Sequence, residues 1–200
     1  MRILQSLFLS GIIVLLGASS LLALDVGKGT YYTKVNIWYE NPQKIVYTNY
    51  HMGAIIPAGS KVEILGINGN KIKFNVNELK GMTFILTNIP KYSLVSTEVL
   101  FSDYFINEEV SPCKFNSSEK ENISNGTIEE GMTKDAVIMS YGYPPKHKTP
   151  ALSSNVWTYW DARATRKVVT FKDNKVKKIE EVNEYEEGRP YHPRWYHYVP

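Results

Sequence analysis

The chain has 200 residues, of which 43% are hydrophobic and 22% are charged, and its formal net charge is +3 at pH 7. This composition is typical of a globular protein with one or two small domains and excludes a disordered or fibrous chain. Lys and Arg are interspersed with Asp and Glu, so the small positive charge marks no nucleic-acid surface and we expect no nucleic-acid partner.

Residues 1–23 have the pattern of a secretory signal peptide. Arg2 precedes the apolar run 7–16, and small residues follow that run. The pattern predicts cleavage after Ala23, or alternatively after Ser20, and export of the remaining chain. The alternative is a retained anchor, although a membrane span needs about 20 mostly apolar residues and this segment contains Ser and Gly. No cysteine lies near the cleavage site, so we expect no lipid anchor and only indirect membrane association.

Residues 30–108 predict a small β-rich domain. Segments 32–39, 45–50, 61–65 and 71–76 are β-branched or alternate polar with apolar residues, and turn residues separate them. Asn68-Gly69 is a strong hairpin signal between the last two segments. The pattern from Thr48 to Ile64 resembles a bacterial SH3-like module. That resemblance implies a small curled sheet and, as one functional alternative, binding of peptidoglycan or a peptide.

Two residues in the first half of the chain bear on enzymatic function. His51 has no acid or nucleophile near it in the sequence, so we expect a surface or turn histidine and not a general base. Cys113 is the only cysteine, so no intrachain disulfide can form, and we expect a lone thiol. An enzyme that uses both residues is an alternative. The chain has no phosphate-binding glycine loop, nucleophile elbow or H-E-x-x-H motif, so we expect no catalytic residue, cofactor or metal.

Residues 109–126 are interpreted as a polar linker between two domains. Ser, Asn, Lys and Glu dominate this stretch, and it holds three Asn-x-Ser/Thr sequons, which fit a solvated loop. Ile123 and Ile128 indicate a further short helical segment, which the neighbouring Gly126 weakens.

Residues 127–182 predict a second domain of mixed α and β structure. Thr133 is a good N-cap, Gly142 suits a helix end and Pro144-Pro145 forbids continuation, which together predict a helix over 134–141. Segments 156–160, 166–171 and 176–179 predict a three-stranded antiparallel meander. A helix of about two turns is not stable alone, so we expect it to pack on this sheet.

The motif of this second half resembles the SmpA/OmlA (BamE-like) family. The matching residues are Gly131-Met-Thr133, Val137, Gly142-Tyr-Pro144, Trp157-Thr-Tyr159-Trp160 and Val169-Thr-Phe171, in the same order and spacing. The resemblance implies two short helices on a three-stranded antiparallel sheet, and a non-catalytic role in assembly or upkeep of the outer membrane. The chain departs from the family because it has no lipid-attachment cysteine and carries an additional β-rich domain.

Aromatic residues outside the predicted core are the candidate partner-binding residues. Trp157 and Trp160 lie on opposite faces of one predicted strand, so one of these faces is available for a contact. Residues 183–200 form a tail rich in aromatics and proline, which favours an adhesive segment over one that packs back on the sheet. The predicted partner-binding residues are Tyr143 and Pro144 at an exposed corner, Trp157, Trp160, Trp195 and Tyr196.

The sequence therefore predicts an exported α+β protein that acts by binding. We expect a periplasmic or outer-membrane-associated protein that supports the outer membrane through contacts with an envelope protein. A secreted module that recognises a cell-wall ligand or a peptide through the SH3-like domain is the alternative.

Overall fold

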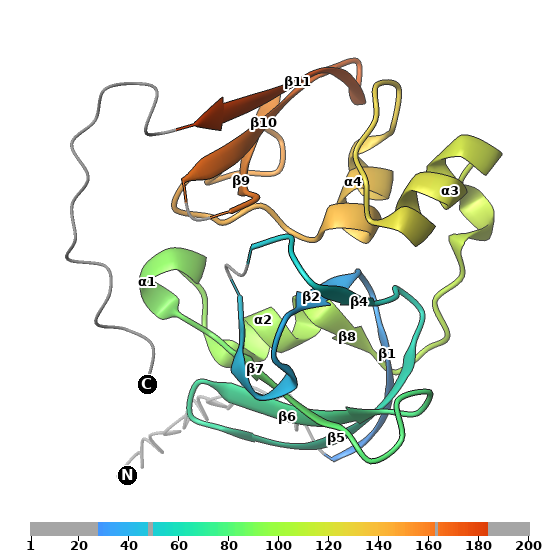
Figure 1. The fold of residues 1–200 in the computed structure, drawn as a ribbon, viewed down its shortest axis with the longest axis vertical. Coiled ribbons are helices and arrows are strands. Elements are labelled where there is room, and N and C mark those ends of the chain that lie inside the picture. Colours follow the sequence, from blue (N-terminus) through green and yellow to red (C-terminus); the bar gives the residue numbers. More distant parts are fainter. Residues whose placement is uncertain (1–27, 48–49, 163, 184–200) are drawn as a thin grey trace, which may run out of the picture.

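The computed structural model describes residues 28–47, 50–162 and 164–183. The predicted signal peptide and the tail that carries Trp195 and Tyr196 lie outside these residues. The described chain is a mixed α+β structure with two lobes, one around a curled six-stranded sheet and one around a three-stranded sheet (Figure 1). Within the described residues, no helix has both the length and the apolar character that a membrane crossing requires.

The first lobe contains most of the strands. Its elements are β1 (Gly29–Thr33), β2 (Ile37–Tyr39), η1 (Pro42–Lys44), β3 (Ile45–Val46), β4 (Ala54–Ile56), β5 (Lys61–Asn68), β6 (Lys71–Val76), β7 (Thr83–Thr87), α1 (Pro90–Ser93), α2 (Thr97–Tyr104), β8 (Phe105–Ile106) and η2 (Pro112–Lys114). The six-stranded sheet has the order β3-β7-β6-β5-β1-β8, and β2 pairs with β4 in a separate two-stranded sheet.

The alternation of polar and apolar residues along the strands places the apolar side chains in the core of this lobe. In β6 the lysines are exposed while Ile72 and Phe74 are buried, and Phe74 stacks on Phe84 of β7 with ring centroids 5.5 Å apart. Gly69, at φ 57°, occupies the left-handed position of the hairpin between β5 and β6. These two strands and their turn were predicted correctly.

The predicted strand 32–39 is wrong as a single element. The chain leaves β1 after Thr33 and enters β2 at Ile37, and these strands belong to different sheets. Val35 and Asn36, between them, are buried, because the chain here passes from the first lobe to its boundary with the second. Helices α1 and α2 also interrupt the segment that was expected to be β-rich.

The second lobe places two helices on an antiparallel meander. Its elements are α3 (Ser117–Asn125), α4 (Lys134–Tyr141), β9 (Val156–Trp160), β10 (Thr165–Lys172) and β11 (Lys175–Asn183), with sheet order β11-β10-β9. Side chains from both helices and from all three strands join in one buried cluster that includes Ile123, Val137, Trp157, Val169 and Val176. The three predicted strands and the predicted helix are therefore confirmed.

The interpretation of residues 109–126 as a polar linker is wrong for residues 117–125, which form α3. Asn116 and Glu119 make a capping box at its start, and Gly126 ends it in the left-handed conformation at φ 66°. Ile123 is buried while most of the polar residues face solvent. Because Ile123 is the one buried apolar residue of α3, the helix has little apolar periodicity. Its polar composition alone therefore indicated a loop.

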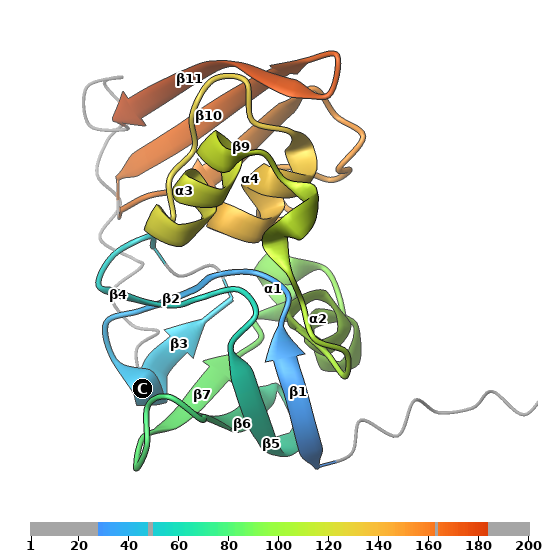
Figure 2. The same ribbon diagram turned by 90° about the vertical axis from the view of Figure 1, so that its right-hand side faces the viewer.

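The two lobes share a buried boundary formed by the β2–β4 pair and the helices α3 and α4 (Figure 2). The Asn36 side chain donates hydrogen bonds to the carbonyls of Ile123, at 2.7 Å, and Ser140, at 2.9 Å, and accepts one from the Ala58 amide at 2.7 Å. Because Asn36 is only 3% exposed, its polar groups depend on these partners. The lobes are thus held in one orientation by specific contacts.

Candidate functional site

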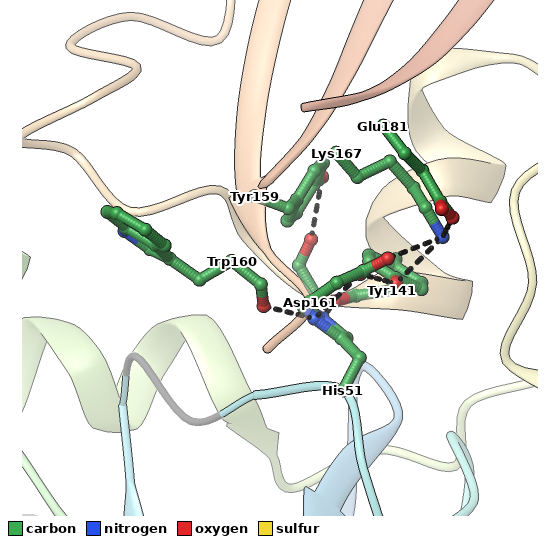
Figure 3. A network of polar contacts seen from close by, with 8 residues as sticks. His51, Tyr141, Tyr159, Trp160, Asp161, Lys167 and Glu181 are labelled. Carbon is green, nitrogen blue, oxygen red and sulfur yellow. Dashed lines mark hydrogen bonds and ion pairs between the residues drawn. The ribbon is translucent and has the colours of Figure 1, made fainter. Parts of the chain in front are cut away.

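His51 lies at the boundary of the lobes, in the segment that leads into β4, and its ring reaches the second lobe (Figure 3). Nδ1 lies 3.0 Å from the carbonyl oxygen of Trp160, and Nε2 lies 2.8 Å from that of Tyr141. The imidazole stacks on the Tyr141 ring with centroids 3.6 Å apart and planes 9° from parallel. The side chain is 11% exposed, so of the expected surface or turn histidine the surface alternative is wrong, whereas the chain does bend at His51.

The surroundings of His51 determine what its ring can do. Burial lowers the pKa of His51, and the two carbonyl contacts and the Asp161 carboxylate oppose that effect without reversing it. A neutral imidazole has a single N–H, so it donates to one of the two carbonyls, whereas the imidazolium would donate to both. Either way both ring nitrogens are directed at backbone carbonyls, which leaves no lone pair facing open space to act on a substrate.

A polar network continues from His51 to the second sheet. The Tyr141 hydroxyl donates to Oδ1 of Asp161, and Lys167 Nζ lies 2.9 Å from Oδ2 of Asp161 and 3.1 Å from the Tyr141 hydroxyl (Figure 3). Glu181 Oε1 lies 3.9 Å from the same ammonium. Burial, followed by the hydrogen bond to Asp161, raises the pKa of Tyr141. Tyr141 therefore stays protonated and acts as a hydrogen-bond donor that ties α4 to the sheet.

Cys113 does not join this network. It lies exposed in η2, where the Ser111 hydroxyl lies 2.9 Å from its Sγ. Since both nitrogens of His51 are directed at carbonyls of the second lobe, neither faces the thiol. The structure does not bring these two residues together as a nucleophile and base. Among the described residues, no group of three or more His, Cys, Asp or Glu side chains is arranged to hold a metal ion.

A hollow of about 300 Å³ lies beside the corner that the sequence singled out. It is lined by Asp103, Tyr143, Pro144, Lys146, Thr149, Pro150 and Leu152. Pro144 is buried and Tyr143 is half-buried, so the expectation of an exposed corner is wrong. Both residues form a wall of the hollow, and Leu152, at 40% exposure, is an exposed residue of the same wall.

Two charged side chains, a carboxylate and an ammonium, line this hollow. Asp103 comes from the end of α2 in the first lobe, and Lys146 from the loop after α4 in the second. Burial raises the pKa of Asp103, although the nearby charges of Lys146 and Lys34 act in the opposite direction. Within the part of the chain that the structure describes, neither Asp103 nor Lys146 makes a side-chain hydrogen bond or ion pair. The hollow therefore offers one carboxylate and one ammonium between apolar walls.

The two tryptophans of β9 have different roles. Trp157 is fully buried among the residues of the second core, so it is a core residue and offers no contact surface. Trp160 is partly exposed on the opposite face, with Lys148 Nζ 5.6 Å and the Arg166 guanidinium 6.0 Å from its ring centroid. Of these two candidates only Trp160 remains accessible.

Sequence reasoning missed the partners of both sites because they are distant in the chain. Asp161 lies near His51 only once the lobes pack, and Asp103 meets Tyr143 in the same way, whereas Tyr141 meets Asp161 and Lys167 when the second lobe folds. The Tyr143-Pro144 corner was the local signal for the hollow. Comparison of the chain with family models, with curated proteins and with solved structures gives no match.

Proposed function

We propose that this is a non-catalytic, exported envelope protein that supports outer-membrane assembly or maintenance through protein contacts. The observation that carries the proposal is the arrangement of α3 and α4 on the sheet β11-β10-β9, with a hollow beside the Gly142-Tyr143-Pro144 corner. This arrangement is what the resemblance to the SmpA/OmlA family implies for the second half of the chain. We assign the second lobe to a BamE-like module and the first lobe to an SH3-like module on that basis.

The geometry of the buried polar groups supports a binding role over a catalytic one. His51 is directed at two carbonyls and Tyr141 is held protonated, so both of these titratable groups are engaged by the protein itself. The hollow has few reactive groups: its lining includes one carboxylate, one ammonium, two prolines and a tyrosine.

Deletion of the gene tests the proposal. Loss of the protein is expected to raise sensitivity to detergents and to antibiotics too large for an intact outer membrane. A gene copy that encodes the full chain restores resistance, whereas a copy without residues 1–23 does not, because the protein then stays in the cytoplasm. Unchanged sensitivity in the deletion strain would count against envelope maintenance, and rescue by the shortened copy would count against export.

A second candidate function is recognition of peptidoglycan or a peptide through the SH3-like lobe. The observation in its favour is that Asp103, from the first lobe, supplies the carboxylate of the hollow. Co-sedimentation of the purified protein with cell-wall sacculi tests it. Binding that is lost in Asp103→Asn and retained in Asp135→Asn, an exposed aspartate outside the hollow, supports this function. Failure of the unmodified protein to co-sediment excludes it.

A further inference from the structure

The outer edge of β11 is available for pairing with another strand. The Phe171 amide donates to the Asn155 carbonyl, and the Asp161 amide donates to the Thr165 carbonyl, so odd-numbered residues of β10 direct their backbone groups toward β9. Alternation along an antiparallel strand then directs the even-numbered residues toward β11. Val168 and Thr170 face Glu180 and Lys178 in that register.

It follows that Ile179 and Glu181 direct their backbone N–H and C=O groups away from the sheet. The start of this edge is covered, because Val176 exchanges backbone hydrogen bonds with Gly131 and Met132. Beyond Val176, no described residue bonds to the outward groups of Ile179 or Glu181. In both ribbon views β11 forms the margin of the molecule farthest from the first lobe (Figures 1 and 2).

The charges along this edge change sign at Ile179. Lys177 and Lys178 precede it, and Glu180 and Glu181 follow it. Edge strands are commonly protected by charges of one sign, which repel an identical edge. Here the sequence reads as positive, apolar, negative, so an antiparallel copy of the same strand places each lysine opposite a glutamate.

We infer that the outer edge of β11 is a self-association surface, on which β11 of a second copy pairs antiparallel about a two-fold axis at Ile179. Ile179 of each copy exchanges two backbone hydrogen bonds with Ile179 of the other, and Lys178 lies directly opposite Glu180. The two sheets become one six-stranded sheet with the helices of both copies on the same face. This inference is independent of the proposed envelope function, because no residue of β11 lines the hollow.

The pairing is short, which determines its strength. Met132 already occupies the position beside Val176, so pairing is restricted to residues 177–181. Within each copy, Lys178 Nζ lies 2.7 Å from Glu180 Oε1, and both side chains are exposed, so this ion pair can be exchanged for the pair between copies at little cost. We therefore expect a dimer that dissociates on dilution and weakens as salt is added.

Sedimentation equilibrium of the protein as recovered from cells, over a range of concentrations, tests the inference. The unmodified protein is expected to dimerise, and Lys178→Glu and Glu180→Lys are each expected to weaken dimerisation at least about tenfold at low salt, because each places like charges opposite one another. An equimolar mixture of the two variants should associate again, since each then meets its complement. The double variant K178E/E180K should also dimerise.

Controls separate this pairing from other effects. Lys114→Glu and Asp135→Lys reverse an exposed ion pair elsewhere and should leave dimerisation unchanged. Thermal unfolding of each variant shows whether the fold is retained. A protein that is monomeric at all concentrations, or single variants that dimerise like the unmodified protein, would overturn the inference. Failure of the mixed variants to associate would equally overturn it, because a complementary pair of edges must recombine.

Discussion

At the scale of single residues, His51 is the most informative side chain of the molecule. Its ring fills the boundary between the lobes, stacks on Tyr141 and has a backbone carbonyl in front of each nitrogen. Because burial lowers its pKa, the folded protein binds a proton at His51 less readily than the unfolded chain does. The contribution of this residue to stability is therefore present at neutral pH and decreases as the pH falls below about 6.5.

Substitution of His51 by Phe tests this behaviour. Phenylalanine retains a ring against Tyr141 but cannot donate a hydrogen bond, so the variant should lose about 1–2 kcal/mol of unfolding free energy at pH 8. The difference from the unmodified protein should shrink toward pH 5, since the variant has no proton to gain there. Urea unfolding at several pH values measures it, with His147→Gln as a control that retains His51. A difference that is constant from pH 5 to 8 would contradict the account.

At the scale of elements, Glu119 joins the starts of two helices. Its Oε1 accepts hydrogen bonds from the amide and the hydroxyl of Thr133, both at 2.8 Å, and its Oε2 accepts one from the Asn116 amide at 3.3 Å. Asn116 and Thr133 are the N-caps of α3 and α4. One buried carboxylate thus satisfies amide groups at the start of α3 and at the start of α4, which fixes how the two helices pair.

The Glu119→Ala variant should unfold about 2–3 kcal/mol more easily, because amide groups at both helix starts lose their acceptor. Burial raises the pKa of Glu119, but hydrogen bonds from Thr133 and Asn116 lower it by more, so its net pKa is lowered. Its stabilisation is therefore complete above about pH 4.5 and is lost as the pH falls through the folded-state pKa. Thermal unfolding between pH 3 and 7 checks this. Glu121→Gln, at an exposed position of the same helix, should have no comparable effect.

At the scale of the whole molecule, the close approach of the two lobes depends on a glycine. A Cβ placed on Gly126 would lie 2.5 Å from Trp38 Cζ2 and 2.7 Å from Ile55 Cδ1, both in the first lobe. Gly126 also has the positive φ that ends α3. The same residue therefore terminates a helix and permits the lobes to touch, so the boundary is part of the folded core and not a flexible junction.

A comparison of two glycine substitutions isolates the contact between the lobes. Gly126→Ala combines the strain of a positive φ with overpacking and should cost about 2–4 kcal/mol. Gly131→Ala has a similar strain at φ 88° but nothing within 4 Å of the new Cβ, so it should cost about 1 kcal/mol. Chemical denaturation of both variants measures the difference. Equal losses would mean that the lobes do not press on each other at Gly126.

The sequence predicted the parts of the fold whose signals are local. Helix α4 has its cap, its stop and its proline within a few residues, and the β5–β6 hairpin has its turn between two alternating strands. For α3, the isoleucines indicated a short helical segment, but the composition indicated a linker, because the buried side of this helix consists of Glu119 and Ile123, which give little periodic pattern. The His51 site was not predictable, because its carbonyl partners are 109 and 90 residues away, and only Tyr143 and Pro144 of the hollow were named, because the hollow combines two lobes.

In-cell photocrosslinking from the hollow tests whether the protein acts through protein contacts in the envelope. A photoreactive residue at Leu152, which lines the hollow and is 40% exposed, is compared with one at Met82, which is 38% exposed and lies in the turn before β7. We expect an adduct from Leu152 to a protein that fractionates with the outer membrane, and no such adduct from Met82. Identical patterns from both positions, or an adduct to a protein outside the envelope, would contradict it.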